Sequence, residues 1–515
     1  MSLARRAVRG AAWTIMSSVL GRFVGVVGTL VLTRLLAPAV VGEVSVATVL
    51  VLSANQFSSF GFGQYVVANP KLTAGHVFQV FSLHTVFGLL GLVIILAIAG
   101  PLAPTLGAPG MAAYLPGLAL SVVLNRISII PERVLVRDMH FTMVGIARTA
   151  GEVAYVVTAV ALAYLGWGGA AIVAGNVTRS LARSALILVA TPRRSWLVPS
   201  KLEKEVVVDV FRFGTPLWLG ASASFFAGKW DNLLISSLFG STQLGLYNLG
   251  YNLADIPTSH VGEHIGDVLL PSFTRIDQSA QRRALLRAAG LLALIVFPLA
   301  VGLGAVSHSL VRTLFNDEWQ GVAPYLTILS ALSVARPIGW IIFSYLQARH
   351  RVRTVMFLEV GKLAALLAFI AILSVFGPLW SAAGVGVGYG LHAIISMWII
   401  DRVDGVPIGR MMLSMLGPLL ACVPMTGAVL LVRHGLALHS PAVGLTLEVV
   451  AGGLVYVGSC FVLARAVTQD LIHLLRHSFL RRAPEEPEPD AAAEAADGGA
   501  REVAGPSAAT APRQP

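Results

Sequence analysis

The sequence predicts an all-α integral membrane protein with about 14 transmembrane helices, in two parallel six-helix lobes followed by two extra C-terminal helices. Of its 515 residues, 56% are hydrophobic and only 12% are charged, against about 25% charged in soluble domains. Apolar runs of about 20 residues, long enough to cross the bilayer, recur along the chain. These runs are continuous, which favours helices over the alternating strands of a membrane barrel. Motifs of the first half also return in the second half.

The apolar runs give the expected spans in order. The first is an uncleaved helix, because its stretch from Ala11 to Leu32 is longer than the core of a signal peptide. Cys422 and Cys460 fall inside spans, so we expect buried apolar side chains and not a disulfide or metal site. The expected spans are 11–33, 42–68, 77–104, 113–131, 143–165, 169–191, 213–239, 244–271, 288–314, 323–347, 355–377, 380–400, 411–432 and 443–465.

The formal net charge of +11 is distributed unevenly between the two sides of the predicted membrane. Basic residues gather in alternate segments, whereas the opposite segments carry only Arg34, Arg312 and Arg433. Because basic loops stay on the cytoplasmic side, both termini are expected to be cytoplasmic. The charge is thus an orientation signal, which argues against a nucleic-acid partner.

Three pairs of motifs indicate an internal repeat. "RLLAPAVVGEV" (34–44) resembles "SLFGSTQLGLY" (237–247), with Gly42 matching Gly245. "AYLPGLALSVVLNR" (113–126) resembles "PYLTILSALSVARP" (324–337), and "LGWGGAAIVAG" (165–175) resembles "FGPLWSAAGVG" (376–386). Parallel repeats related by an axis along the membrane normal are typical of transporters that bind substrate between their halves.

This repeat divides the chain into segments. The expected segments are a cytoplasmic N-terminal segment (1–10), an N-lobe (11–191), a cytoplasmic connector (192–212), a C-lobe (213–402), spans 13 and 14 (403–465), a basic amphipathic cytoplasmic helix (466–482) and a disordered acidic tail (483–515).

Three stretches resemble a known family. They are "LTRLLAPAVVGEVSVATVL" (32–50), "KWDNLLISSLFGSTQLGLYNLGYNLADIP" (229–257) and "LFNDEWQGVAPYLTILSAL" (314–332). They are similar to the oligosaccharide flippase branch (Wzx-like, PST) of the multidrug/oligosaccharidyl-lipid/polysaccharide exporter (MOP, MATE-like) superfamily. The resemblance covers about residues 5 to 430; Ala37 departs from it by replacing a usual glycine, and so does the acidic tail.

The resemblance implies a fourteen-helix, two-lobed transporter in the bacterial cytoplasmic (inner) membrane. Such proteins move undecaprenyl-pyrophosphate-linked oligosaccharides to the outer leaflet by alternating access, for O-antigen, capsule or exopolysaccharide assembly. The implied partners are the lipid-linked oligosaccharide, the lipid bilayer, a polysaccharide polymerase and chain-length machinery. No cofactor is expected.

Basic residues inside spans are candidates for the substrate path, because an ionisable side chain in the membrane usually faces a cavity or a partner. The alternatives for one of them, Arg148, are an ion pair with Glu152 one turn on or a side chain that extends to the inner membrane surface. Two other candidates, Arg126 and Arg336, occupy equivalent positions in the repeat to within one residue. The candidates are Arg22, Arg126, Arg148, Lys229 and Arg336.

Acidic residues inside spans are candidates for gating or for coupling to H⁺ or Na⁺, between which the sequence does not choose. Lys229 and Asp231 point to different helix faces, so each needs its own partner, and Asp255 is expected to serve one of them. The family resemblance implies that Asp231 faces the space between the lobes. Glu359 is also three residues from Lys362, which favours a structural pair. The coupling candidates are Glu152, Asp231, Asp255 and Glu359.

A further polar cluster, His260, Glu263, His264 and Asp267, shares one helix face. This spacing is compatible with a metal site, but we favour a hydrated polar stripe and expect no metal.

Other functions remain as alternatives. A membrane glycosyltransferase or polysaccharide polymerase would need an outer catalytic loop, whereas the outer loops here are short and the only D-x-x-D, Asp401 to Asp404, is on the cytoplasmic side. The chain is therefore not expected to be an enzyme. A lipid II flippase or a drug/cation antiporter of the same superfamily stays open. An assembly scaffold would leave the intramembrane charges without a role.

Overall fold

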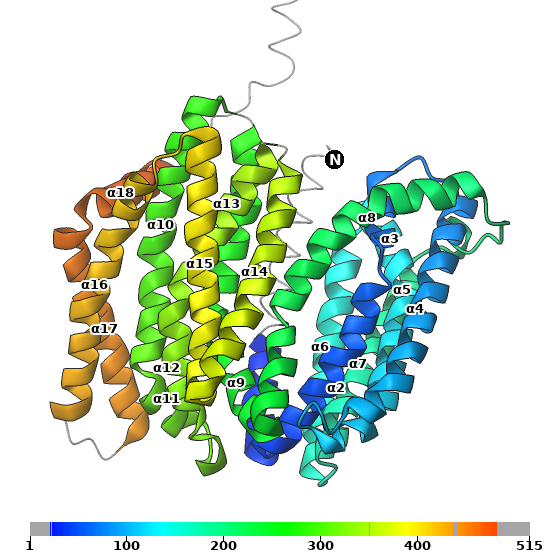
Figure 1. Ribbon diagram of the computed structural model, residues 1–515, viewed down its shortest axis with the longest axis horizontal. Coiled ribbons are helices and arrows are strands. Elements are labelled where there is room, and N and C mark those ends of the chain that lie inside the picture. Colours follow the sequence, from blue (N-terminus) through cyan, green and yellow to red (C-terminus); the bar gives the residue numbers. More distant parts are fainter. Residues whose placement is uncertain (1–20, 22, 275, 350, 436–439, 481–515) are drawn as a thin grey trace, which may run out of the picture. The chain divides into compact units, whose positions relative to one another are not determined.

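Helices joined by short turns make up the described part of the chain. The computed structural model describes residues 21, 23–274, 276–349, 351–435 and 440–480. Helical residues Phe23–Leu35 come first. The helices that follow are α2 (Pro38–Phe57), α3 (Phe62–Ala68), α4 (Ala74–Leu102), α5 (Leu115–Arg137), α6 (Phe141–Tyr164), α7 (Gly169–Ala190), α8 (Lys204–Ala227), α9 (Trp230–Thr274), α10 (Gln278–Ala305), α11 (Ser307–Leu314), α12 (Val322–Leu332), α13 (Arg336–Ala348), α14 (Val352–Leu373), α15 (Pro378–Asp404), α16 (Ile408–Gly435), α17 (Pro441–Leu463) and α18 (Arg465–Leu480) (Figure 1).

Length and composition make the membrane assignment firm. Within the described residues, 10 helices are long and apolar enough to cross a membrane, with α12 and α13 counted together. This confirms a multi-pass membrane protein. Helices α5 and α8, in the fourth and seventh predicted spans, carry several charged residues each, among them Arg126 and Glu132 on α5. The start of α10 is capped by Asp277, whose carboxylate accepts a hydrogen bond from the backbone N–H of Ala280.

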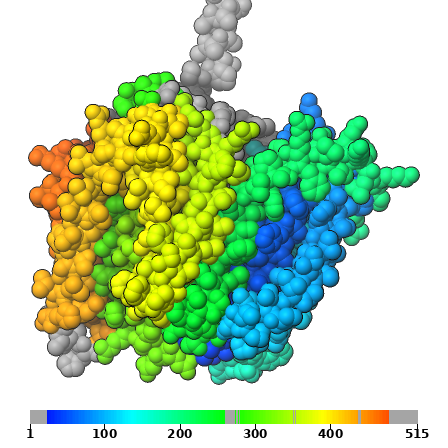
Figure 2. All heavy atoms as spheres, viewed as in Figure 1, coloured from blue at the N-terminus to red at the C-terminus, as the bar shows by residue number. Residues whose placement is uncertain are grey.

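The helices pack in two groups. Helices α2 to α7 contact one another and form the N-terminal group; α9, α10 and α12 to α15 do the same and form the C-terminal group. Helices α16 and α17 form a hairpin, and α16 lies along α10. The N-terminal group is blue to cyan and the C-terminal group green to yellow in Figure 1, and Figure 2 shows the side chains of both groups from the same side.

Helix α8 contacts both groups. Near its start, Val206 and Val210 are buried with Phe62 of α3 in an apolar cluster. Near its end, the Ser224 hydroxyl donates a hydrogen bond to Glu359 of α14 (2.7 Å). The predicted connector, 192–212, is therefore shorter than expected. Its last residues are already helical because Val206 and Val210, four apart, present one apolar face to the N-terminal group.

The N-terminal and C-terminal groups meet where α2 and α9 cross. A Cβ atom added to Gly42 would lie 2.7 Å from the carbonyl carbon of Ser241 and 3.1 Å from its Cα. A Cβ added to Gly245 would lie at the same two distances, 2.7 and 3.1 Å, from the equivalent atoms of Pro38. The sequence repeat pairs Gly42 with Gly245, so the crossing is reciprocal. Both backbones touch because neither glycine has a side chain.

Hydrogen bonds between the groups reinforce this end. The backbone N–H of Ser241 donates to the Gly107 carbonyl (3.0 Å), and the indole N–H of Trp319 donates to the Leu36 carbonyl (3.1 Å). Gly240, with φ of 83°, turns the chain inside α9, where the sequence predicted a turn between spans. The crossing is thus a closed contact between the two groups.

Four predicted spans are interrupted, and one of them, 288–314, breaks at Val306 between α10 and α11. The span 42–68 breaks between α2 and α3, where Phe60 and Gly61 have positive φ. The span 213–239 breaks at Gly228 and Lys229, between α8 and α9. A 3-10 turn at 333–335 separates α12 from α13. The break between α2 and α3 has a packing reason, because a Cβ on Gly61 would come within 2.9 Å of Gly214 on α8.

Residues from Ala466 onward form a separate unit, within which α18 is the described helix. The acidic tail predicted at 483–515 and the N-terminal segment 1–10 lie outside the described residues.

Candidate functional site

Asp231 is a buried carboxylate in the first turn of α9. Its Oδ2 accepts a hydrogen bond from the Tyr247 hydroxyl (2.5 Å), and its Oδ1 accepts one from the backbone N–H of Asn232 (2.8 Å). A helix N-terminus stabilises a negative charge, and the hydrogen bonds supply donors that water cannot. Lys229 lies at the break just before α9, close enough to act electrostatically on Asp231.

Arg336, on α13 of the C-terminal group, is a buried cation. Its Nη1 donates to Oδ1 of Asp255 at 2.6 Å, and its guanidinium stacks on Tyr251 and Tyr389 with 4.5 and 4.6 Å to the ring centroids. The side chain of Asp255 is 40% exposed. The expectation that Asp255 partners Lys229 or Asp231 is therefore corrected. Asp255 lies on the side of α9 that faces α13, and its partner is Arg336.

Glu359 links α14 to α8. It accepts hydrogen bonds from the Ser224 hydroxyl (2.7 Å) and from Lys362 (2.5 Å). The predicted Glu359–Lys362 pair is confirmed. Glu359 also lines a small cavity together with His392 of α15. The described C-terminal group thus contains polar clusters around Arg336 and around Glu359, and also one in which Asp404 of α15 pairs with Arg349 and Arg351.

Arg126 is the buried arginine of the N-terminal group, 1% exposed. It donates to the side-chain oxygen and the carbonyl of Asn55, both at 3.0 Å, and to the Ser58 hydroxyl and the His84 carbonyl. Its guanidinium occupies the space that a side chain at Gly88 would fill. In this conformation Arg126 joins the C-terminal end of α2, at Asn55 and Ser58, to His84 of α4.

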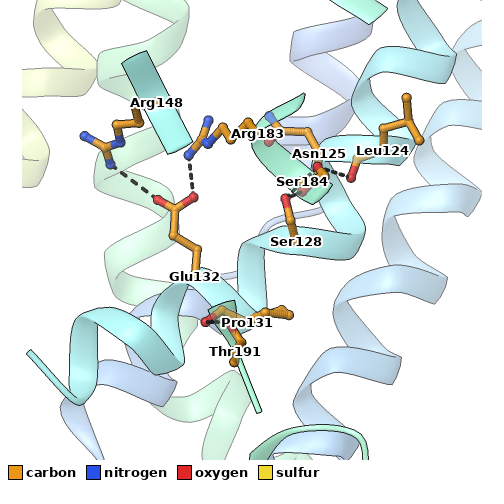
Figure 3. Close-up of polar contacts among 9 residues, drawn as sticks. All are labelled: Leu124, Asn125, Ser128, Pro131, Glu132, Arg148, Arg183, Ser184 and Thr191. Atoms are coloured by element: carbon orange, nitrogen blue, oxygen red, sulfur yellow. Dashed lines mark hydrogen bonds and ion pairs between the residues drawn. The ribbon is translucent and has the colours of Figure 1, made fainter. Parts of the chain in front are cut away.

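Glu132 of α5 lies between two arginines (Figure 3). Arg148 of α6 approaches its Oε1 at 3.4 Å and Arg183 of α7 its Oε2 at 2.6 Å. Glu152 is paired with Arg179 instead, at 2.9 Å. The alternative of an Arg148–Glu152 pair is therefore wrong, because Arg148 pairs with Glu132. The two helices α6 and α7 approach closely at Gly151, which brings Arg179 and Arg183 within reach of carboxylates on neighbouring helices.

The sequence interpretation missed Glu132, Arg179 and Arg183. Glu132 was placed just beyond the fourth span, and it lies inside α5. The two arginines were visible as charges four apart in the predicted span 169–191, a pattern that places both on one helix face. Arg22 lies outside the described residues, as do the side chains of His260, Glu263, His264 and Asp267. Among the residues that the structure describes, no cluster of His, Cys, Asp and Glu has the composition of a metal site.

An apolar cavity of about 530 Å³ lies between α9, α10, α16 and α17. Leu253, Ile256 and Pro257 of α9 form one wall, and Val449 and Tyr456 of α17 contribute to the other. Leu253 and Ile256 flank Asp255 in the sequence. Helix α9 therefore carries an apolar cavity on one side and the Asp255–Arg336 pair on another.

A buried ion pair closes one end of this cavity. Glu448 of α17 lines the cavity and pairs with Arg433 of α16 at 3.2 Å. The Ser309 hydroxyl of α11 also donates to Glu448 (2.6 Å), and Arg433 donates to the Ala305 carbonyl at the end of α10 (2.5 Å). These contacts fasten the α16–α17 hairpin to the C-terminal group.

Ten apolar helices in the described residues, with buried charges beside an apolar cavity, define a multi-pass membrane protein. The fold agrees with solved transporters. It is similar to a lipid II flippase, MurJ, in an inward closed conformation, with a TM-score of 0.72, 12% identity and coverage of 90% of this chain and 100% of that one. It is also similar to an inward-facing multidrug resistance transporter (MATE) of the MOP superfamily, with a TM-score of 0.58, 14% identity and coverage of 78% and 98%.

The sequence pattern of the polysaccharide biosynthesis protein family matches residues 31–324, and the chain belongs to this family. It is 24% identical over 403 residues to the lipopolysaccharide biosynthesis protein WzxC of Escherichia coli (strain K12), covering 77% of this chain and 80% of that protein. It is 24% identical over 498 residues to the succinoglycan biosynthesis transport protein ExoT of Rhizobium meliloti (strain 1021), covering 93% and 98%. The predicted family is confirmed. Among the proteins that the chain resembles, ExoT is named a transport protein, and the two solved structures are a flippase and a transporter.

Proposed function

We propose that the protein is a flippase that moves undecaprenyl-pyrophosphate-linked oligosaccharide repeat units across the bacterial cytoplasmic membrane, for the assembly of O-antigen, capsule or exopolysaccharide. The observation that carries this proposal is the arrangement on α9. An apolar cavity of about 530 Å³ lies on one side of this helix, and the Asp255–Arg336 pair lies on another. A lipid-linked oligosaccharide needs both surfaces, because its polyprenyl chain seeks an apolar environment and its pyrophosphate and sugars need polar partners.

The mechanism that we propose is alternating access between two six-helix lobes of a fourteen-helix protein. The reciprocal crossing of Gly42 and Gly245 supports this, because equivalent helices of a parallel repeat meet at equivalent residues. The crossing lies at the end that the loop charges predict to be outer, with both termini cytoplasmic. The described conformation would then be closed to the outside, and α2 and α9 must separate for release.

Charged residues receive roles within this mechanism. Arg148 and Lys229, which are not sealed inside a group, are the foremost candidates for contact with an anionic cargo. Asp231, Asp255, Glu359 and Glu152 are the candidates for coupling transport to H⁺ or Na⁺. A carboxylate held by neutral donors, as Asp231 is by Tyr247, changes its interactions when it binds a cation or a proton.

Lipid II is the one alternative cargo that a structural observation favours. The high similarity to MurJ in fold leaves lipid II as a competing cargo. The two cargoes share the polyprenyl pyrophosphate and differ in their sugars. A polysaccharide polymerase and chain-length machinery are the partners that the first cargo requires.

The test is transport by the purified protein in liposomes. Fluorescent lipid-linked repeat unit from the host strain is placed in the inner leaflet, and its appearance outside is measured by enzymatic trimming of exposed sugars. Lipid II in matched liposomes is the competitor. Faster translocation of the repeat unit than of lipid II supports the proposal. Equal rates with protein-free liposomes for both lipids would refute a flippase function, and a preference for lipid II would replace the cargo.

A further inference from the structure

The cluster around Glu132 differs from an ordinary structural ion pair in its exposure. Glu132 is 3% exposed, whereas the side chain of Arg148 is 55% exposed. Arg183, from a third helix, is intermediate between them. Figure 3 shows both guanidinium groups directed at the two carboxylate oxygens from α6 and α7. One carboxylate is therefore enclosed by two cations, of which one, Arg148, is exposed at the surface of the described protein.

The cluster also has an excess of positive charge. Arg148 and Arg183 carry two positive charges against the one negative charge of Glu132, so one positive charge in the cluster has no carboxylate to balance it. In addition, the buried Nε of Arg183 has no hydrogen-bond partner among the described residues. A buried donor without an acceptor is costly, so the cluster is better suited to an anion with more charge and more oxygens.

We propose that Arg148 and Arg183 form a binding site for the phosphate of a phosphate ester, and that the Glu132 carboxylate fills this site as an internal anion when no phosphate is bound. A guanidinium group can donate two parallel hydrogen bonds to two oxygens of one phosphate, a geometry that favours arginine at phosphate sites. A phosphate group carries a charge of up to about −2, which offsets the excess that Glu132 leaves. The inference rests on the proposed function, because the lipid-linked cargo supplies a pyrophosphate; a phospholipid headgroup is the other source of the same chemistry.

Competition between Glu132 and phosphate gives opposite effects for two substitutions. Glu132→Gln keeps the size of the side chain and removes its charge, so the affinity for phosphate should rise about tenfold. Arg183→Gln removes the closer guanidinium, and the affinity should fall by about tenfold or more. Arg148→Gln should also weaken binding, and it is the variant least prone to unfold because its side chain is the most exposed.

The matched control is Arg137→Gln. Arg137 lies on the same helix as Glu132 but pairs with the neighbouring Asp138 at 3.0 Å. A change at Arg137 removes the same charge from the same end of α5 without touching the cluster. It should leave the affinity for phosphate unchanged.

The measurement is calorimetric titration of inorganic pyrophosphate into the full-length protein in phosphatidylcholine nanodiscs, with thermal unfolding of each variant as a check. A second set of nanodiscs contains phosphatidylglycerol. If this lipid weakens pyrophosphate binding in the unsubstituted protein, and less so in Arg148→Gln, the phosphate source is a lipid headgroup. If it has no effect, the source is the cargo. Either result, with opposite shifts for Glu132→Gln and Arg183→Gln, supports the site.

The inference is overturned if Glu132→Gln leaves the affinity unchanged or lowers it in a folded protein, or if Arg137→Gln weakens binding as much as Arg148→Gln. If Arg183→Gln unfolds, the affinity of Arg148→Gln for pyrophosphate decides, and an unchanged affinity in that variant overturns the inference. Binding and transport are measured separately, so the two proposals can fail separately. Normal flipping without the expected binding pattern rejects the site, and the expected binding pattern without flipping rejects the proposed function.

Discussion

Replacing Gly42 by alanine should drive the N-terminal and C-terminal groups apart at the α2–α9 crossing. The added methyl group would meet the backbone of Ser241, 2.7 Å from the carbonyl carbon and 3.1 Å from Cα. Carbon atoms normally approach to about 3.5–4.0 Å, so the helices must part by roughly 1 Å. Backbone atoms cannot rotate away as a side chain would, and the strain therefore falls on the contact between the groups.

The size of the effect follows from two opposing contributions. Overpacking a close contact costs about 1–3 kcal/mol. Alanine also favours the helix over glycine by about 1 kcal/mol, but this gain is the same whether α2 and α9 touch or not. It cancels in the equilibrium between the closed and the separated conformations. The separated conformation should therefore gain about 1–3 kcal/mol, which corresponds to roughly a 5- to 150-fold change in population.

Pulsed electron paramagnetic resonance measures this change. Spin labels at Thr105→Cys and Asn316→Cys, both exposed, report the separation of the two groups after Cys422 and Cys460 are replaced by alanine. Thr105 is close in sequence to Gly107, and Asn316 to Trp319, whose hydrogen bonds join the groups at the crossing. Gly42→Ala should enlarge the population with the longer distance. Gly100→Ala on α4 is the control, because a Cβ there meets no atom within 4 Å.

The reciprocal geometry adds a sharper criterion. Gly245→Ala should produce the same shift as Gly42→Ala, because its Cβ meets Pro38 at the same distances. The double substitution should have less than the summed effect, since the first methyl group already separates the backbones that the second would strain. An unchanged distance distribution in both single variants, or a strictly additive double variant, would refute the crossing as a contact that must open.

Three further predictions concern buried charges. Arg126→Met should destabilise the protein by about 3 kcal/mol or more, because the side-chain oxygen and the carbonyl of Asn55 lose the charged donor that Arg126 supplies; thermal unfolding in detergent measures this, and an unchanged midpoint would contradict a structural role at the end of α2. Arg433→Met and Glu448→Gln should each lower the free energy of unfolding by about 3–5 kcal/mol, and the double variant should lower it by less than the sum of the two. A double-mutant cycle of unfolding free energies measures this, and strictly additive effects would contradict the ion pair. Asp231→Asn should preserve folding through its hydrogen bond to Tyr247 but remove the dependence of transport on an ion gradient, and a gradient dependence that survives would exclude Asp231 as the coupling residue.

The membrane class, the turn at Gly240 and the pairing of Gly42 with Gly245 could be predicted because each rests on local features. Apolar length determines a span, and a glycine between apolar runs marks a turn or a close approach. The reciprocal contact then follows from the repeat, because equivalent positions in two similar halves meet when their axes are related by symmetry. The Glu359–Lys362 pair was equally local, since three residues on a helix fix its geometry.

The partners of the remaining charges could not be predicted, because they depend on how helices distant in sequence are rotated against one another. Asp255 and Arg336 are 81 residues apart, and neither spacing nor composition connects them. Glu152 had Arg148 one turn away but pairs with Arg179 on α7. A hydrophobic pattern defines which face of a helix avoids lipid, but the rotation within that face is decided by side-chain packing across the contact.

The two buried arginines of the repeat, Arg126 and Arg336, show how equivalent positions acquire different functions. The partners of Arg126 are carbonyls, an amide and a hydroxyl, none of which changes charge between pH 5 and 8. The partner of Arg336 is a carboxylate that is 40% exposed and so accessible to protons and cations. Only the C-terminal arginine therefore has a counter-ion that can be neutralised or displaced. Asp255 lies on the part of α9 after Gly240, which crosses α2 at Gly245, and Asp231, before Gly240, is bonded to Tyr247 of that same part. A change in the charge of either carboxylate therefore acts on the segment whose movement opens the contact. We therefore expect ion coupling, where it occurs, to act through the C-terminal group, with the N-terminal arginine holding the other half of the repeat fixed.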